Sequence, residues 1–155
     1  MKVLIATYWE YPHAGGVSSH MASLRDALVR NGVDAFAVGC NTAGSKIGGT
    51  HSYISKIEAK REIQKEELHR LINQQKFDIV NAQDVRTVMA LKEIRCTLPV
   101  ILTVHGYLRD EAVSAGAVSR GSKEDEYLLN SEWKGYRYAD DIIAVDTRIS
   151  EHVLK

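Results

Sequence analysis

Five short apolar runs, separated by segments of helical period, constrain the fold of this sequence more than any other feature. The first run, Lys2–Thr7, is nearly unbroken, as expected of a strand that is buried on both faces of a sheet. The runs cover Lys2–Thr7, Val33–Gly39, Phe77–Asn81, Pro99–Val104 and Asp141–Val145. Because parallel strands need long crossover connections, strands that alternate with helices predict a parallel sheet.

The segments between these runs carry the periodicity of helices. Apolar residues after the first run recur at steps of four, three and four, which places them on one helical face: Val17, Met21, Leu24 and Leu28. Ser18 or Ser19 is the expected cap of that helix. Further helices are expected over Glu58–Gln75, from the cap Asp84 through Arg95, from the cap Ser122 to Ala139, and onward from Thr147. With right-handed crossovers, this order predicts an α/β fold, a doubly wound, mostly parallel, Rossmann-like sheet with helices on both faces.

Two segments show neither period and are expected to be loops. Residues 40–57 are rich in glycine and are predicted to hold a short strand near Tyr53. Residues 105–121 are rich in Gly, Ala and Ser. Such residues are typical of loops, so we expect no regular element over 105–121.

Length and composition narrow the class of protein. The 155 residues suffice for one domain with a hydrophobic core, so residues 1–155 are treated as one unit. Lys+Arg and Asp+Glu balance at 20 each, which argues against a dedicated nucleic-acid binder. Cys40 and Cys96 lie far apart and are expected to be buried, reduced thiols. The N-terminal apolar run is too short for a signal peptide or membrane span, so a cytoplasmic location is expected, with peripheral membrane contact left open.

Ligands of doubly wound sheets bind beyond the carboxyl ends of the strands, where Gly15 and Gly16 precede a predicted helix. Glycines let a ligand approach the backbone, and a helix N-terminus favours an anion. A phosphate-bearing ligand and a tight turn without any ligand are both consistent with this pair. Neither the spacing of a dinucleotide-binding loop nor that of a P-loop is found, which argues against a dehydrogenase or a kinase.

Three further features lie near the same expected edge. His105 follows the fourth apolar run directly, which suits ligand contact or proton chemistry, although a half-buried histidine bonded to a loop is the alternative. His13 and His20 lie near the glycine pair, but they lack metal-ligand spacing to Cys, Asp or Glu, so no metal site is expected. The aromatic loop over residues 8–11 suits stacking on a sugar or packing against a neighbouring loop.

Taken together, five pieces of the sequence resemble the N-terminal domain of family 4 glycosyltransferases, enzymes of the GT-B fold. They occur in the order and spacing of that family from Met1 to the last residue: MKVLIAT, AGGVSSHMASLRDALVRNG, FDIVNAQD, LPVILTVHG and YADDIIAVDTRISEHVL. One departure is the segment NAQD after the third run, where many relatives have a histidine-rich stretch.

The resemblance implies a retaining transferase that uses a nucleotide-activated sugar, with no required metal or other cofactor. It assigns the donor phosphates to Gly15 and Gly16 and contact with the transferred sugar to His105, without naming a nucleophile. The N-terminal domain of the family mostly holds the acceptor, here a sugar or a lipid-linked acceptor. The candidate acceptor-binding residues are His13, His20, Tyr107 and Arg109.

The C-terminal domain of the family supplies most donor contacts, and no part of this sequence corresponds to it. That domain is therefore the expected partner, and the chain alone is expected to be inactive, because catalysis needs donor and acceptor in one closed cleft. Two alternatives stay open: a non-enzymatic α/β module that binds a small phosphorylated ligand, and half of a nucleotide-sugar epimerase. The donor sugar, the nucleotide, the acceptor and the oligomeric state are not readable from the sequence.

Overall fold

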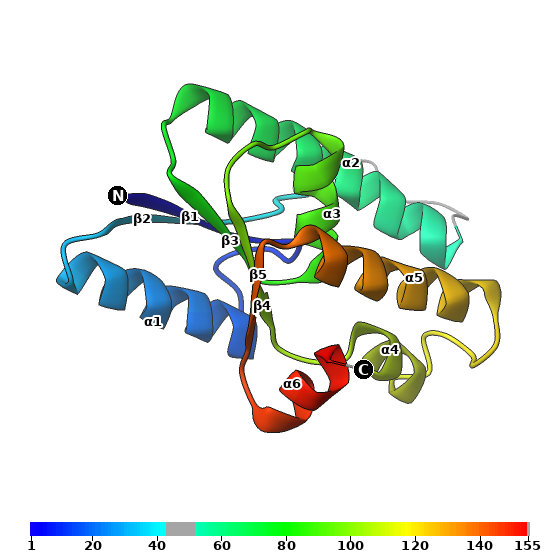
Figure 1. Cartoon of the computed structure of the whole chain (residues 1–155). Coiled ribbons are helices and arrows are strands. Elements are labelled where there is room, and N and C mark those ends of the chain that lie inside the picture. The colour runs from blue at the N-terminus through cyan, green and yellow to red at the C-terminus, as the bar shows by residue number, and fades with distance from the viewer. Residues whose placement is uncertain (43–51, 155) are drawn as a thin grey trace.

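The computed structural model describes residues 1–42 and 52–154, which form five strands and six helices (Figure 1). The strands are β1 (Lys2–Thr7), β2 (Asp34–Gly39), β3 (Ile79–Ala82), β4 (Val100–Val104) and β5 (Asp141–Ala144). The helices are α1 (Gly16–Arg30), α2 (Tyr53–Gln74), α3 (Val85–Glu93), α4 (Leu108–Ser114), α5 (Lys123–Tyr138) and α6 (Thr147–Val153).

All described strand pairs are parallel, and the strands lie in the order β2-β1-β3-β4-β5. The α/β, doubly wound, Rossmann-like fold predicted from the apolar runs is therefore confirmed. From β1 the chain continues to β2, at one edge of the sheet, whereas from β3 it continues to β4, toward the opposite edge. This reversal between β1 and β3 is a topological switch point, where sheets of this type open a crevice for ligands.

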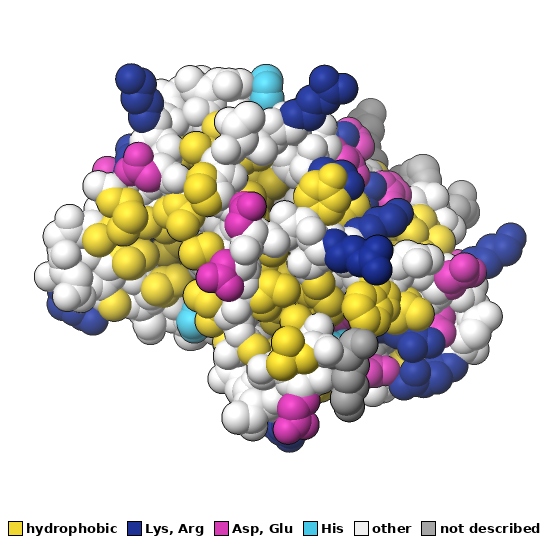
Figure 2. All heavy atoms as spheres, in the orientation of Figure 1, with side chains coloured by type: hydrophobic (Ala, Val, Ile, Leu, Met, Phe, Trp, Pro, Cys, Tyr) yellow, Lys and Arg dark blue, Asp and Glu magenta, His cyan; other side chains and the backbone are white. Residues whose placement is uncertain are grey.

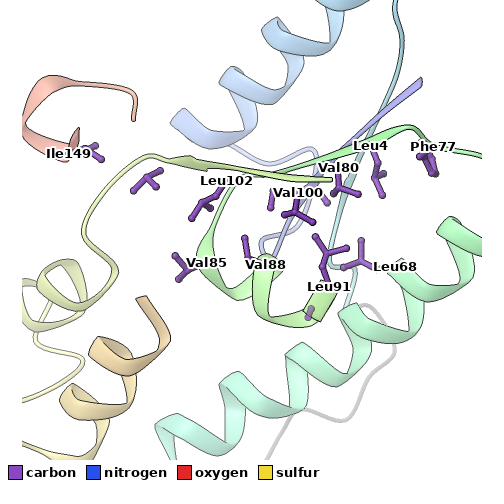
Figure 3. Packing of buried hydrophobic residues seen from close by; sticks show 14 residues of the cluster. Leu4, Leu68, Phe77, Val80, Val85, Val88, Leu91, Val100, Leu102 and Ile149 are labelled. Atoms are coloured by element: carbon purple, nitrogen blue, oxygen red, sulfur yellow. The ribbon is translucent and has the colours of Figure 1, made fainter. Parts of the chain in front are cut away.

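Side-chain alternation in β1 explains why helices cover both faces of the sheet. Val3 and Ile5 pack with Met21 of α1 on one face. On the other face, Leu4 and Ala6 belong to a larger core that includes residues of α2 and α3. Figure 3 shows Leu68, Val88 and Leu91 from these two helices beneath the strands that carry Val80, Val100 and Leu102.

Two of the expected helix caps are confirmed, and one is wrong. The Asp84 carboxylate accepts a hydrogen bond from Thr87 N at the start of α3, and Ser122 Oγ accepts one from Asp125 N at the start of α5. The N-cap of α1 is Gly15, which offers no side-chain cap. The Ser18 hydroxyl instead accepts from His13 N, so it fixes the loop before the helix.

Two loop predictions also need correction. Tyr53 belongs to no strand but begins α2, because Ser52 Oγ accepts from Ser55 N and caps a helix there. Residues 43–51 of the expected loop 40–57 lie outside the described residues. The expected loop 105–121 contains α4, which an ion pair between Arg109 and Asp125 fixes against α5.

Strand β5 forms one edge of the sheet and leaves apolar side chains partly exposed. Ile143 of β5 and Val145, which follows the strand directly, are 49% and 45% exposed, and Figure 2 shows hydrophobic side chains on both sides of the line that β5 follows in Figure 1. The two cysteines are free thiols, as expected, although Cys40 is buried and Cys96 only half-buried. Burial raises the pKa of the Cys40 thiol to about 11, so this thiol is protonated at neutral pH.

Candidate functional site

A cleft of about 350 Å³ opens at the carboxyl ends of β1, β3 and β4, at the switch point of the sheet. Its walls come from the segments that follow these strands and from the inner face of α5. The lining residues are Trp9, Gly16, Val17, Gln83, Asp84, Val85, Arg86, Val104, His105, Gly106, Leu108, Glu111, Glu132 and Tyr136. Segments far apart in the sequence thus meet where the fold rule places a ligand.

The two glycines before α1 have different structural roles. Gly15 has a φ of +153°, and a Cβ there would lie 3.3 Å from His13 Cε1, so a side chain at this position is strained. Gly16 lines the cleft, and a Cβ built on it meets nothing within 4 Å. The first N–H groups of a helix have no intrahelical acceptor, so those of α1 are available to an anion in the cleft.

His105 ends a row of hydrogen-bonded side chains that crosses the sheet. Its Nε2 lies 2.8 Å from Gln83 Oε1, and Gln83 Nε2 donates to Asn81 Oδ1. Asn81 Nδ2 donates in turn to Thr103 Oγ1 at 3.0 Å. These residues share one face because side chains two apart in a strand point the same way. The row fixes the orientation of the His105 ring.

Burial and a second histidine favour the neutral form of His105. The pKa of His105 is lowered first by burial and then by the nearby His20, whose ring centroid lies 4.8 Å away. His20 reaches this position from α1, so the contact joins the glycine segment to the end of β4. A neutral imidazole at neutral pH can accept a hydrogen bond from a hydroxyl group without adding charge to the cleft.

Replacing His20 with alanine is expected to raise the pKa of His105, because the change lets water reach the ring and removes the electrostatic effect of the His20 imidazole. A pH titration of the imidazole signals by NMR measures this shift. His152→Ala is the matched control, since the His152 ring contacts Tyr107 instead of His105. An unchanged His105 pKa in His20→Ala would contradict the role given to His20.

Asp84 connects the end of β1 to the start of α3 beside the cleft. One carboxylate oxygen accepts from Thr87 N at 2.8 Å, and the other accepts from Tyr8 N at 2.8 Å and Thr7 Oγ1 at 2.9 Å. The carboxylate is therefore used to hold the aromatic loop in place. This arrangement agrees with the expectation that Asp84 is a helix cap.

Two charged side chains are deeply buried in the cleft wall. Arg86, on the first turn of α3, is 7% exposed, and Glu132, on α5, is 3% exposed. Burial raises the pKa of Glu132 to about 7, against the opposing effect of the Leu108 and Arg109 backbone N–H groups. Within the described residues, Glu132 Oε1 and the Tyr136 hydroxyl have no hydrogen-bond partner.

The sequence over residues 14–155 matches the family model described as Glycosyltransferase Family 4. This chain belongs to glycosyltransferase family 4. Its architecture agrees with the N-terminal Rossmann-like domain of the GT-B fold. None of the curated proteins matches the sequence.

Two solved structures are similar to this family 4 chain. UDP-GlcNAc 2-epimerase from Methanocaldococcus jannaschii matches with a TM-score of 0.61 and 14% identity, over 99% of this chain and 42% of the epimerase. A ugt transferase from Siraitia grosvenorii, in complex with UDP, matches with a TM-score of 0.54 and 14% identity, over 93% of this chain and 41% of the transferase. The family 4 chain thus spans about two fifths of either protein, and at this identity the likeness shows the fold alone.

The predicted site residues of this family 4 chain fall into two groups. Gly16 and His105 line the cleft, and His20 contacts the His105 ring. Tyr107 and Arg109 do not line it: the Tyr107 ring lies against His152, at 4.6 Å between centroids, and Arg109 is paired with Asp125. The assignment of Tyr107 and Arg109 to an acceptor remains a prediction.

Gly15 and His13 lie next to the cleft without lining it. Gly15 supplies the backbone conformation that starts α1. The His13 ring lies beside Gly15, and its Nδ1 is buried without a hydrogen-bond partner among the described residues. The phosphate contact predicted for Gly15 and the acceptor contact predicted for His13 likewise remain predictions.

The sequence analysis does not single out three charged residues that line the cleft: Arg86, Glu111 and Glu132. A usable sign existed for Glu132, because it follows Leu128 by four residues and so shares the buried face of a predicted helix.

Within the described residues, no group of three His, Cys, Asp or Glu side chains could hold a metal ion. None of the described helices is long and apolar enough to cross a membrane.

Proposed function

We propose that this family 4 domain is the acceptor-binding half of a retaining glycosyltransferase that uses a nucleotide-activated sugar. One observation carries the proposal: the N-terminus of α1 at Gly16 opens into the same cleft as His105. A helix N-terminus suits donor phosphates, and a neutral histidine suits the hydroxyl groups of a sugar. The family match over residues 14–155 supports transfer, and no metal is assigned to the reaction.

The acceptor is a sugar or a lipid-linked molecule that enters the same cleft. Its candidate contacts are His20, which lies against His105, and the adjoining segments that carry His13, Tyr107 and Arg109. The partner is a second, donor-binding domain, which would close over the cleft and exclude water. A cytoplasmic location, with peripheral contact to a membrane where the acceptor is lipid-linked, completes the proposal.

Sugar transfer by residues 1–155 alone is expected to be undetectable. Reaction requires both substrates to be held in one closed cleft, and this cleft has walls from one domain only. The measurement is product formation from UDP- and GDP-sugars with candidate acceptors, with and without an added donor-binding domain. Transfer by the chain alone would contradict the half-site proposal.

Gly16→Val tests the glycine segment. The fold should tolerate the change, because a Cβ at Gly16 meets nothing within 4 Å, but a branched side chain would cover the N–H groups that face the cleft. We expect UDP and GDP to bind roughly tenfold or more weakly in calorimetric titration, with an unchanged melting temperature. Ala14→Val, an exposed change in the same loop, is the control and should leave binding unchanged.

The titration also separates transfer from the alternative functions. Weak nucleotide binding by the wild-type chain that strengthens when the second domain is added supports the half-site. Micromolar binding by the chain alone, abolished by Gly16→Val, would favour a self-sufficient module for a phosphorylated ligand. The fold shared with UDP-GlcNAc 2-epimerase makes epimerisation the enzymatic alternative. Product analysis distinguishes it, since an epimerase changes the sugar of the donor without forming a new glycosidic bond.

A further inference from the structure

Arg86 is a buried cation that forms no salt bridge with any of the described residues. Its side chain is 7% exposed, and its Nε is buried with no hydrogen-bond partner among the described residues. Two half-buried arginines elsewhere in the described residues do form ion pairs: Arg61 with Glu58 and Glu93, and Arg109 with Asp125. An unpaired buried charge is costly, so its retention points to a partner that binds from outside the chain.

Two aromatic rings contact Arg86 and support its position without pairing its Nε. The guanidinium carbon lies 4.7 Å from the centroid of the Tyr8 ring and 5.5 Å from that of the Trp9 ring. Ring faces attract a cation, yet they accept none of its five N–H donors in the way that an oxygen does. The guanidinium is thus held in a fixed place at the cleft, and its Nε has no hydrogen-bond partner among the described residues.

The surrounding charges favour an anion beside Arg86. Arg86 is the one Lys or Arg among the described residues that line the cleft, and Gly16 at the N-terminus of α1 lines it as well. The Asp84 carboxylate is already occupied by Thr7, Tyr8 and Thr87. Glu111 and Glu132 also line the cleft, but none of the salt bridges among the described residues joins either of them to Arg86.

We propose that Arg86, together with the N-terminus of α1, forms a binding site for a phosphate group in this cleft. A guanidinium offers two parallel N–H donors to phosphate oxygens, and the helix N-terminus adds backbone N–H groups. The site itself requires only a ligand that carries a phosphate group. The proposed function enters only in identifying which substrate carries that group. The phosphate belongs either to the donor nucleotide or to a phosphorylated acceptor.

Arg86→Met tests this site. Methionine keeps an unbranched apolar stem against the Tyr8 and Trp9 rings and removes the charge. Inorganic phosphate, a sugar 1-phosphate and UDP are titrated separately into the 155-residue chain. The comparison shows whether the phosphate belongs to the donor nucleotide or to a phosphorylated acceptor. Whichever ligand binds should bind roughly 10- to 100-fold more weakly to the variant. The melting temperature of the ligand-free variant should be equal or higher, because an unpaired buried charge is removed.

Arg70→Gln is the matched control. Arg70 is an exposed arginine of α2 that donates a hydrogen bond to Gln74, so the change removes the same charge away from the cleft. Phosphate binding by this variant should equal that of the wild type. A purely structural role for Arg86 would instead lower the melting temperature of Arg86→Met and leave phosphate binding unchanged.

The outcomes identify the source of the phosphate and separate this site from the proposed function. Arg86-dependent binding of the sugar 1-phosphate indicates a phosphorylated acceptor, whereas dependence seen with UDP alone indicates the donor. Equal binding by wild type and Arg86→Met, or no binding of any of the three ligands by the wild type at millimolar concentration, overturns the site. If Arg86-dependent binding persists but no sugar is transferred when the donor-binding domain is supplied, the proposed function fails and the phosphate site stands.

Discussion

Replacing Glu132 with glutamine is expected to stabilise the protein in alkaline solution and to have little effect in acid. Burial raises the pKa of Glu132 from 4.5 to about 7. The folded protein therefore keeps a proton that the unfolded chain releases between these two values, and stability falls as the pH rises through that window. The cost is absent below the unfolded pKa and complete above the folded one, where it amounts to about 3 kcal/mol.

Glutamine removes this cost, because it has the shape of the protonated acid and does not ionise. Its amide can donate to the Tyr136 hydroxyl, which has no hydrogen-bond partner within the described residues. Urea unfolding at about pH 4 and about pH 8 measures the effect, and the gain should be about 3 kcal/mol larger at the higher pH. Glu126→Gln, an exposed change on the same helix, should show no such difference. A gain independent of pH would contradict the buried-acid interpretation.

Replacing Asp84 with alanine is expected to lower the free energy of unfolding by about 3 kcal/mol. The loss of a helix cap costs about 1 kcal/mol, and hydrogen bonds to a charged group contribute about 1.5–3 kcal/mol, although such terms are not additive. Alanine removes both the cap of α3 and the acceptor of Tyr8 N. Because Tyr8 and Trp9 support Arg86, the same change should also weaken phosphate binding.

Two variants separate the cap from the connection to β1. Ser122→Ala removes a cap of the same kind at α5, whose hydroxyl accepts from Asp125 N, and should cost about 1 kcal/mol. Asp84→Asn keeps an oxygen for the cap but sets an amide against Tyr8 N, so its cost should lie between those of the other two variants. Chemical denaturation gives all three values. Equal costs for Asp84→Ala and Ser122→Ala would show that Asp84 acts only as a cap.

The sheet and part of the cleft were predictable because they depend on local patterns. Strands of a parallel sheet are largely apolar because helices cover both of its faces, so the apolar runs located the strands, the edge strands β2 and β5 included. A parallel sheet brings the carboxyl ends of its strands to one edge, so the sequence alone places Gly16 and His105 at the same edge. Asp84 was predictable as a helix cap because that role is local: its carboxylate accepts from the backbone N–H three residues further along the chain.

The features that the sequence did not reveal depend on contacts between distant segments. Arg86 resembles a surface residue at the start of a helix, and its burial results from the Tyr8–Trp9 loop that folds over it. Helix α4 has no long apolar period and is stabilised by the ion pair of Arg109 with Asp125 on α5. The same pair lowers the pKa of the Asp125 carboxyl, first through its hydrogen bond to Arg109. No spacing rule within one segment indicates such a contact.

The hydrogen-bonded row that ends at His105 determines which atom of each side chain donates and which accepts. The Ile101 carbonyl can only accept, so it keeps the Asn81 amide nitrogen turned toward it, 3.4 Å away. Asn81 Oδ1 then faces the Gln83 nitrogen, which leaves Gln83 Oε1 to accept from His105 Nε2. The neutral ring is thereby locked as one tautomer, with its hydrogen on Nε2 and a lone pair on Nδ1. Through that nitrogen, the ring can accept a hydrogen bond from a hydroxyl group, while its one N–H is committed to Gln83.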